Sequence, residues 1–346
     1  MTCQDGPSAG SAPRVLALRA LGLGDLLTAV PALRALRRAH PGHRLLLAAP
    51  RWLAEAAAAT GAVDELLPAA APGRAVPARL PWRGPPPDCA VDLHGNGPAS
   101  LAPLRALRPG RLLAYADPTG PAWHPEEHER ARWCRLLTWY GLPADPGDLA
   151  LAAPPLPSPA PGAVVVHPGA DAGARRWPAE RFAAVARRLR RAGWRVVLTG
   201  GLGERDLVRR VAELAGLPPS AAALGLPFRR LAALLASARA VLVGDTGIAH
   251  LATALGTPSV VLFGPVSPRL WGPPPGPRHR VLWHPDGPVD ADDPAGLVPG
   301  DPHGTRPDPR LLRITPREVL AALHDLPPAP VHAPGPRVTH VPGRHA

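Results

Sequence analysis

The stretch VLVGDTGIAHLATALGTPSVVLFGP, residues 241–265, decides the fold. An apolar run at 241–243 stops at a glycine, small residues follow over 247–255, and a second apolar run covers 259–263. This order predicts a β-strand, a crossover helix and a second, parallel strand. The turn into the helix carries more polar and small residues than a tight connection requires, namely Asp245, Thr246, Gly247 and His250.

The same alternation runs through the rest of the chain and predicts an α/β fold with parallel sheets. Strands are expected at 14–18, 43–50, 88–95, 163–167, 194–199 and 239–243, with one long helix from about Asp25 to Ala39. The 346 residues exceed what one hydrophobic core usually serves, which favours two domains. The uncharged, proline-rich segment 151–162 is typical of a linker between them.

The expected organisation follows from these boundaries. Its parts are a disordered lead-in at 1–13, an N-terminal domain at 14–150, the linker at 151–162, a C-terminal domain at 163–326 with a Pro/Gly-rich loop at 272–310, and a disordered tail at 327–346. Because ligands of parallel sheets bind at the carboxyl ends of the strands, the cleft between the two sheets is the expected site.

Composition limits the class of protein. The formal net charge is +12 and favours anionic ligands, although the arginines that carry it are scattered along the chain. The three cysteines, Cys3, Cys89 and Cys134, form no CxxC pair, so neither a zinc site nor a disulfide framework is indicated. The first residues lack the apolar core of a signal peptide, and no apolar run reaches the roughly 18 residues of a membrane span. A cytoplasmic protein is expected.

The loop after the first strand holds Gly22, Gly24 and Asp25. Asp25 is either an N-cap of the following helix or a carboxylate that faces the cleft as a general base. A dinucleotide fingerprint fails here, because its third glycine position is occupied by Leu27 and no acidic residue ends the second strand. A Walker loop is excluded because the sequence contains no lysine.

The loop after the strand at 163–167 places Arg175 and Arg176 just before Trp177 and a helix. Two guanidinium groups beside a helix N-terminus make an anion site; the alternative is a solvated loop in which Trp177 packs. At the hinge quoted above, the Thr246 hydroxyl, helix N–H groups and the His250 imidazole suit a diphosphate. The alternative there is Asp245 as N-cap and a surface His250.

These loops, taken in order, resemble glycosyltransferase family 9, the ADP-heptose:lipopolysaccharide heptosyltransferase family. The matching segments are LGLGDLLTAVPALRAL, DLHGN, HPGADAGARRWPAERFAAV, LTGGLGERDLV and GDTGIAHLATALGTPSVVLFGP. They lie within 14–265, with weaker agreement at 311–324. The resemblance implies a GT-B fold of two Rossmann-like domains, with the acceptor on the N-terminal and the donor on the C-terminal domain. It also implies an inverting transfer from a nucleotide-diphosphate sugar with neither a metal nor another cofactor.

Residue by residue, the resemblance implies Asp25 as the catalytic base and Arg175 as the cation that neutralises the leaving diphosphate. The expected donor-binding residues are Gly169, Ala170, Arg175, Arg176, Glu204, Asp245, Thr246, Gly247 and His250. Glu204 is either a contact of the nucleoside or an acid that stabilises the first turn of its helix. On the acceptor side the expected residues are Gly24, His94 and Asn96.

The chain also departs from the family pattern. Members often carry several cysteines in the segment corresponding to 284–311, and this chain has none there. The sequence Asp-Ala-Asp at 290–292 offers a metal-binding motif, but its proline-rich context and the GT-B interpretation argue against that role.

The expected partners are a nucleotide-diphosphate sugar, such as ADP-heptose, and a glycan or glycolipid acceptor, with peripheral contact at the inner face of the cytoplasmic membrane. Two other functions stay open: a nucleotide-sugar enzyme of the same fold, such as an epimerase, and a non-catalytic polyanion-binding protein. No basic stripe with interleaved aromatic residues is visible, so specific nucleic-acid binding is not expected.

Overall fold

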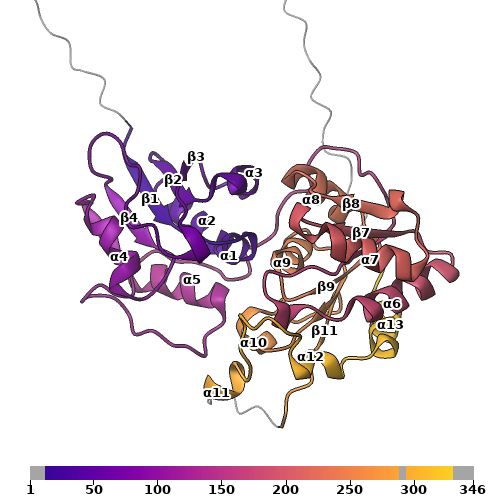
Figure 1. The fold of residues 1–346 in the computed structure, drawn as a ribbon. Coiled ribbons are helices and arrows are strands. Elements are labelled where there is room, and N and C mark those ends of the chain that lie inside the picture. The colour runs from indigo at the N-terminus through magenta and orange to yellow at the C-terminus, as the bar shows by residue number, and fades with distance from the viewer. Residues whose placement is uncertain (1–11, 288–293, 330–346) are drawn as a thin grey trace, which may run out of the picture.

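The computed structural model describes residues 12–287 and 294–329. Within them the strands form two sheets, one from each half of the chain (Figure 1). The strands of the first sheet are β1 (Arg14–Leu18), β2 (Arg44–Ala49), β3 (Glu65–Pro68), β4 (Cys89–Asp92) and β5 (Arg111–Leu113). Their order is β3-β2-β1-β4-β5, and every neighbouring pair is parallel.

The second sheet repeats this architecture. Its strands are β6 (Val164–His167), β7 (Val196–Gly200), β8 (Ala222–Leu224), β9 (Ala240–Gly244), β10 (Ser259–Leu262) and β11 (His279–Leu282). Their order is β11-β10-β9-β6-β7-β8, again with parallel pairs throughout. Two parallel α/β sheets confirm the predicted fold class.

The order of each sheet reverses beside its first strand, between β1 and β4 in one half and between β6 and β9 in the other. Loops on either side of such a reversal diverge, which leaves a crevice at the carboxyl ends of the strands where ligands bind. The loops that the sequence singles out follow these four strands and β7. The topology therefore gathers them at two facing edges.

Helices connect the strands of the first half. They are α1 (Leu23–Thr28), α2 (Val30–Ala39), α3 (Ala54–Ala59), α4 (Pro98–Arg105) and α5 (Glu129–Trp139), with short 3₁₀ turns η1 (Arg51–Leu53) and η2 (Pro72–Arg74). The prediction of one helix from Asp25 to Ala39 was wrong, because the helix starts at Leu23 and breaks at Ala29. Pro31 has no N–H to bond the preceding turn, so a new helix starts beside it.

Helices also connect the strands of the second half. They are α6 (Ala179–Arg191), α7 (Arg205–Ala215), α8 (Phe228–Ala236), α9 (Gly247–Ala254), α10 (Pro268–Trp271), α11 (Pro294–Leu297), α12 (Pro309–Arg313) and α13 (Pro316–His324), with 3₁₀ turns η3 (Gly173–Arg175), η4 (Leu202–Glu204) and η5 (Pro219–Ala221). The prediction of loop throughout 272–310 was wrong, because β11 pairs with β10 there. The apolar residues Val281 and Leu282 make this possible on an edge strand.

Each sheet is covered on both faces. Along β1, Val15 and Ala17 enter one apolar cluster, while Leu16 and Leu18 enter another on the opposite face. This is the alternation of a strand buried on both sides. The halves also share a core, since Leu27 of α1 packs in the same apolar cluster as Ile248 of α9. Figure 1 shows α1 and α9 facing each other between the sheets.

Some predictions fall outside the description. Most of the expected lead-in and tail, at 1–11 and 330–346, lies beyond the described residues, and so does the Asp-Ala-Asp sequence at 290–292. Over 12–287 and 294–329, no helix combines the length and apolarity needed to span a bilayer.

Candidate active site

The loop after β1 places a carboxylate at the edge of the first sheet. Gly22 is the N-cap of α1, and Asp25 is the third helical residue. The prediction of Asp25 as the N-cap was wrong, but one of its carboxylate oxygens, Oδ2, accepts the Gly22 N–H at 2.9 Å, so Asp25 still helps to close the helix start as the acid of a capping box. Its side chain nevertheless stays 16% exposed. Capping and a reactive role are therefore compatible.

The buried Arg19 contacts this loop through its guanidinium group. Arg19 is 1% exposed, and its Nη2 lies 2.7 Å from Glu129 Oε1 and 3.6 Å from Asp25 Oδ1. Its Nε donates to the Asp25 carbonyl at 3.0 Å. The guanidinium thus fixes both the backbone and the charge environment of Asp25. Sequence reasoning missed this pair; the only local signal is a charged residue at the end of an apolar strand.

A second arginine reaches Asp25 from η2. Arg74 Nη2 lies 3.9 Å from Asp25 Oδ2 and 2.9 Å from Asp171 Oδ2 in the second half. Its guanidinium occupies the space beside Gly22, where a Cβ would come within 2.2 Å of Nη2. Arg74 therefore bridges an acid from each half of the molecule. No sequence motif selects Arg74, because it belongs to none of the loops that carry the motifs.

The loop after β4 lies next to Asp25. The carboxylate of buried Asp92 accepts the N–H of His94 at 2.9 Å and shapes the turn. His94 Nδ1 then accepts the Ala20 N–H at 3.2 Å, which ties this loop to the β1 loop. Burial and the charge of Arg19 lower the pKa of His94 to about 4, so it is neutral near pH 7. Asn96 is exposed further along the loop.

The hinge of the second sheet follows β9. Thr246, not Asp245, is the N-cap of α9, and its Oγ1 accepts the Ile248 N–H at 3.3 Å. The Thr246 hydroxyl proton stays available, because this bond uses only an acceptor site of the oxygen. The first N–H groups of α9 have no intrahelical acceptor. This end of the helix can thus donate to an anion, as predicted from Thr246 and Gly247.

Arg175 and Arg176, which were both predicted to bind an anion, contact different groups. Arg175 Nη1 lies 3.5 Å from Asp245 Oδ2, whereas Arg176 Nε donates to the Ala170 carbonyl at 2.8 Å. Arg176 therefore holds its own loop, and Arg175 alone reaches the hinge. Trp177 is buried and donates to the Ile314 carbonyl at 3.1 Å, so it packs as the structural alternative predicts.

Burial sets the charge state at the hinge. It raises the pKa of Asp245; the adjacent Arg175 opposes this rise and Asp25 adds to it. Burial also lowers the pKa of His250 to about 4. The imidazole is accordingly a neutral hydrogen-bonding group near pH 7, and Arg175 is a cation beside the hinge.

Glu204 joins the loops after β6 and β7. Its Oε2 accepts the Gly201 N–H at 2.8 Å and lies 4.0 Å from His167 Nε2. A Cβ at position 169 would lie 2.0 Å from Glu204 Oε1, so a larger residue there would displace this carboxylate. The acid therefore caps η4, as the structural alternative states, while it stays beside Gly169 at the edge of the site.

The two halves meet at glycines. A Cβ on Gly24 would lie 2.9 Å from His250 Cδ2, and one on Gly247 would lie 3.0 Å from the Gly24 nitrogen. Helix α1 of the first half and helix α9 of the second are thus in contact at these residues. Together the edges offer a partly exposed carboxylate, an arginine beside Asp245 and a helix N-terminus, groups that can act as a base and as an anion site. Among the described residues no cluster of three metal-binding side chains occurs.

Comparison with known proteins identifies the family. The model of glycosyltransferase family 9 (heptosyltransferase) matches residues 141–290. Lipopolysaccharide heptosyltransferase 1 of Pseudomonas aeruginosa is 30% identical over 292 residues, which cover 75% of this chain and 81% of that protein. The chain belongs to glycosyltransferase family 9. This confirms the resemblance inferred from the loop motifs.

Solved structures agree on the fold of this glycosyltransferase. The ADP-heptose lipopolysaccharide heptosyltransferase II of E. coli superposes with a TM-score of 0.69 at 20% identity, covering 90% of this chain and 97% of that one. The E. coli heptosyltransferase WaaC with ADP-2-deoxy-2-fluoro heptose gives a TM-score of 0.56 at 20% identity, covering 82% and 96%. The GT-B architecture of the glycosyltransferase is thus shared with these proteins.

Proposed function

We propose that this glycosyltransferase moves a heptose from ADP-heptose to a hydroxyl of a lipopolysaccharide-type glycolipid, with inversion at the anomeric carbon. One observation carries the proposal: Gly24 of α1, which precedes Asp25, contacts Gly247 at the α9 N-terminus, and the charges of both Asp25 and Arg175 act on Asp245. Two relatives are named lipopolysaccharide heptosyltransferase 1 and 2, which supports the acceptor. A solved structure is named ADP-heptose lipopolysaccharide heptosyltransferase II, which supports the donor.

In this proposal the second half holds the donor. The diphosphate accepts hydrogen bonds from Thr246 and the first N–H groups of α9, and Arg175 offsets the charge that grows as the sugar leaves. Asp245 orients that guanidinium from 3.5 Å. A cation and a helix terminus stabilise a leaving diphosphate without a metal ion. Glu204 and Gly169 line the neighbouring edge, where the nucleoside binds.

The first half supplies the nucleophile. An acceptor hydroxyl attacks the anomeric carbon from the face opposite the diphosphate, and Asp25 takes its proton. The electron pair of the C–O bond to phosphate leaves with ADP. His94 and Asn96 contact the acceptor. Because that acceptor is a glycolipid, the enzyme works in the cytoplasm at the inner face of the membrane.

A transfer assay tests this function. Purified protein is incubated with ADP-heptose and a lipopolysaccharide core that lacks heptose, with either Mg²⁺ or EDTA, and the products are resolved by mass spectrometry. The proposal predicts a mass increase of one heptose on the acceptor, equal ADP release in both buffers and, by NMR of the product, an inverted anomeric centre. Consumption of ADP-heptose at the same rate without acceptor would instead indicate an epimerase-like enzyme. No turnover of any nucleotide sugar would contradict the proposal.

A further inference from the structure

A cavity of about 360 Å³ lies in the second half, far from the candidate active site. It is bounded by α6, α13 and the first residues of β6 and β9, Val164 and Ala240. The active-site loops follow the opposite ends of these strands, roughly 15 Å away at 3.3 Å per residue. The cavity is therefore a separate feature of the fold, and donor and acceptor binding do not use it.

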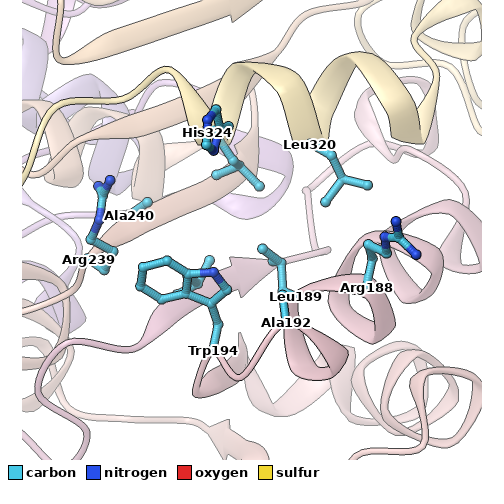
Figure 2. A pocket seen from close by; sticks show the side chains of 10 residues that line it. Arg188, Leu189, Ala192, Trp194, Arg239, Ala240, Leu320 and His324 are labelled. Carbon is cyan, nitrogen blue, oxygen red and sulfur yellow. The ribbon is translucent and has the colours of Figure 1, made fainter.

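Its lining combines apolar and cationic groups. Figure 2 shows the Trp194 ring opposite Leu320 and His324 of α13, with Arg239 at one end and Arg188 at the other. Trp194 is 43% exposed, although most tryptophans bury more of their surface. The Arg239 guanidinium lies 5.8 Å from the Trp194 ring centroid, within cation–π range.

The charge of the lining residues determines which class of ligand this cavity can bind. The residues that line it include two arginines and no acid among those described. The C-terminal ends of α6 and α13 point here and add about half a negative charge each, which the two guanidinium groups exceed. Further arginines, Arg187, Arg190 and Arg191, lie along the last turns of α6. The net field at the cavity is positive.

Two occupants of the cavity are considered, the chain's own residues from 330 onward and a small molecule. The positive charge of the cavity distinguishes between them. The chain beyond the described residues, from 330 onward, contains Arg337 and Arg344 and no acidic residue. A basic segment is repelled by a basic cavity. The volume falls within the range of small-molecule sites, which pair an apolar lining with a few polar groups. We propose that this cavity binds a small aromatic anion, a flat ring system that stacks at Trp194 and carries a carboxylate, sulfonate or phosphate held by Arg188. Arg239, whose Nη1 and Nη2 donate to the Pro327 and Leu326 carbonyls, contributes its charge.

Two related probes test the proposal on the full-length protein. 8-Anilinonaphthalene-1-sulfonate is an aromatic anion, and N-phenyl-1-naphthylamine is the same ring system without the sulfonate. Fluorescence titrations give the affinity of each. Trp194→Ala is expected to weaken both probes by about tenfold, and Arg188→Glu is expected to weaken only the sulfonate by a similar factor. Both side chains are exposed, so the variants are expected to keep the Tm of the parent protein.

Matched variants control for nonspecific binding. Trp139→Ala removes another exposed tryptophan, and Arg187→Glu reverses another exposed charge on α6; both are expected to leave the affinities within about twofold. Arg175→Ala, at the candidate active site, is also expected to have no effect on the probes. Equal losses in Trp194→Ala and Trp139→Ala, or a loss in Arg175→Ala alone, would overturn the proposal. So would a tenfold gain on truncation after Ala329, because it would show that the chain's own end fills the cavity.

Discussion

Glu129 matters at the residue scale because it neutralises a fully buried guanidinium. Arg19 Nη2 lies 2.7 Å from Glu129 Oε1, and the Trp133 indole N–H donates to the same oxygen at 2.9 Å. Removing the carboxylate charge leaves Arg19 buried without its main counter-ion. Loss of one partner of such a pair costs about 3–5 kcal/mol, far more than a surface pair contributes.

Glu129→Gln is therefore expected to lower the free energy of unfolding by about 3 kcal/mol and to reduce turnover, because Arg19 also holds Asp25. Urea denaturation and a transfer assay measure the two effects. Glu213→Gln, on the exposed face of α7, is the control and is expected to change neither. Equal stability of the two variants would show that the buried pair is not what supports the loop.

The buried imidazoles make stability depend on pH. His94 has a pKa of about 4, below the usual value near 6.5 of an unfolded chain. Between these values the unfolded state binds more protons than the folded state, so stability is present above pH 6.5 and is lost as the pH falls toward 4. His250 acts in the same direction.

We expect the Tm of the protein to fall between pH 7 and pH 5, and His94→Gln to flatten that fall. The destabilisation that this variant causes is accordingly smaller at pH 5 than at pH 7. His303→Gln, at an exposed position, serves as the control. The same pH dependence in all three proteins would rule out His94 as a source of the acid sensitivity.

Sequence alone placed several site residues near one another but did not supply their partners. Polar residues that directly follow predicted strands indicated Asp25, Arg175 and the hinge as site residues, because the carboxyl ends of parallel strands lie at one edge of a sheet. Arg19 and Glu129 are 110 residues apart. No local pattern reports a pair at that separation, so the support of Asp25 became visible only in three dimensions.

At the scale of elements, the contact between α1 and α9 fixes the distance between the proposed base, Asp25, and the proposed anion site at the α9 N-terminus. Gly24 and Gly247 allow this approach because neither has a side chain. The sequence motifs include both glycines, but they predict Gly24 to lie in a loop, whereas it lies inside α1. Short strands such as β8 were missed because three half-buried residues give too little alternation to detect.

Gly24→Ala is expected to reduce kcat/KM by about tenfold, because its Cβ would lie 2.9 Å from His250 Cδ2 and force α1 away from α9. Gly42→Ala is the control, since nothing lies within 4 Å of a Cβ there. Steady-state kinetics of both variants check this. Normal kcat/KM in Gly24→Ala would mean that the close contact is not needed for turnover.

At the scale of the whole molecule, apolar packing joins the halves, and polar contacts cross the boundary at several points, among them the bridging Arg74. Leu27 packs with Ile248 across the boundary, and Arg74 links Asp25 to Asp171. The side chains of Arg74 and Asp171 are 49% and 77% exposed, so their ion pair contributes at most about 1 kcal/mol. The core, not Arg74, holds the halves together.

Arg74→Ala is consequently expected to leave the Tm within about 2 °C of the parent but to lower kcat/KM, because Arg74 lies beside Asp25, the proposed base. Calorimetry and kinetics separate the two effects. Arg79→Ala removes an exposed arginine from the same segment and is the control. A large fall in Tm with normal kcat/KM would assign Arg74 a structural role instead.

The central claim is that Asp25 is the base, and Asp25→Asn tests it most directly. Asparagine keeps the size of the side chain and can still accept the Gly22 N–H, so the α1 cap is retained. Transfer rate and ADP-heptose affinity are measured on this variant and on Asp206→Asn, a first-turn acid of α7. We predict a loss of about 10³-fold in kcat with donor affinity unchanged in Asp25→Asn, and no change in the control. Normal turnover by Asp25→Asn would contradict the account.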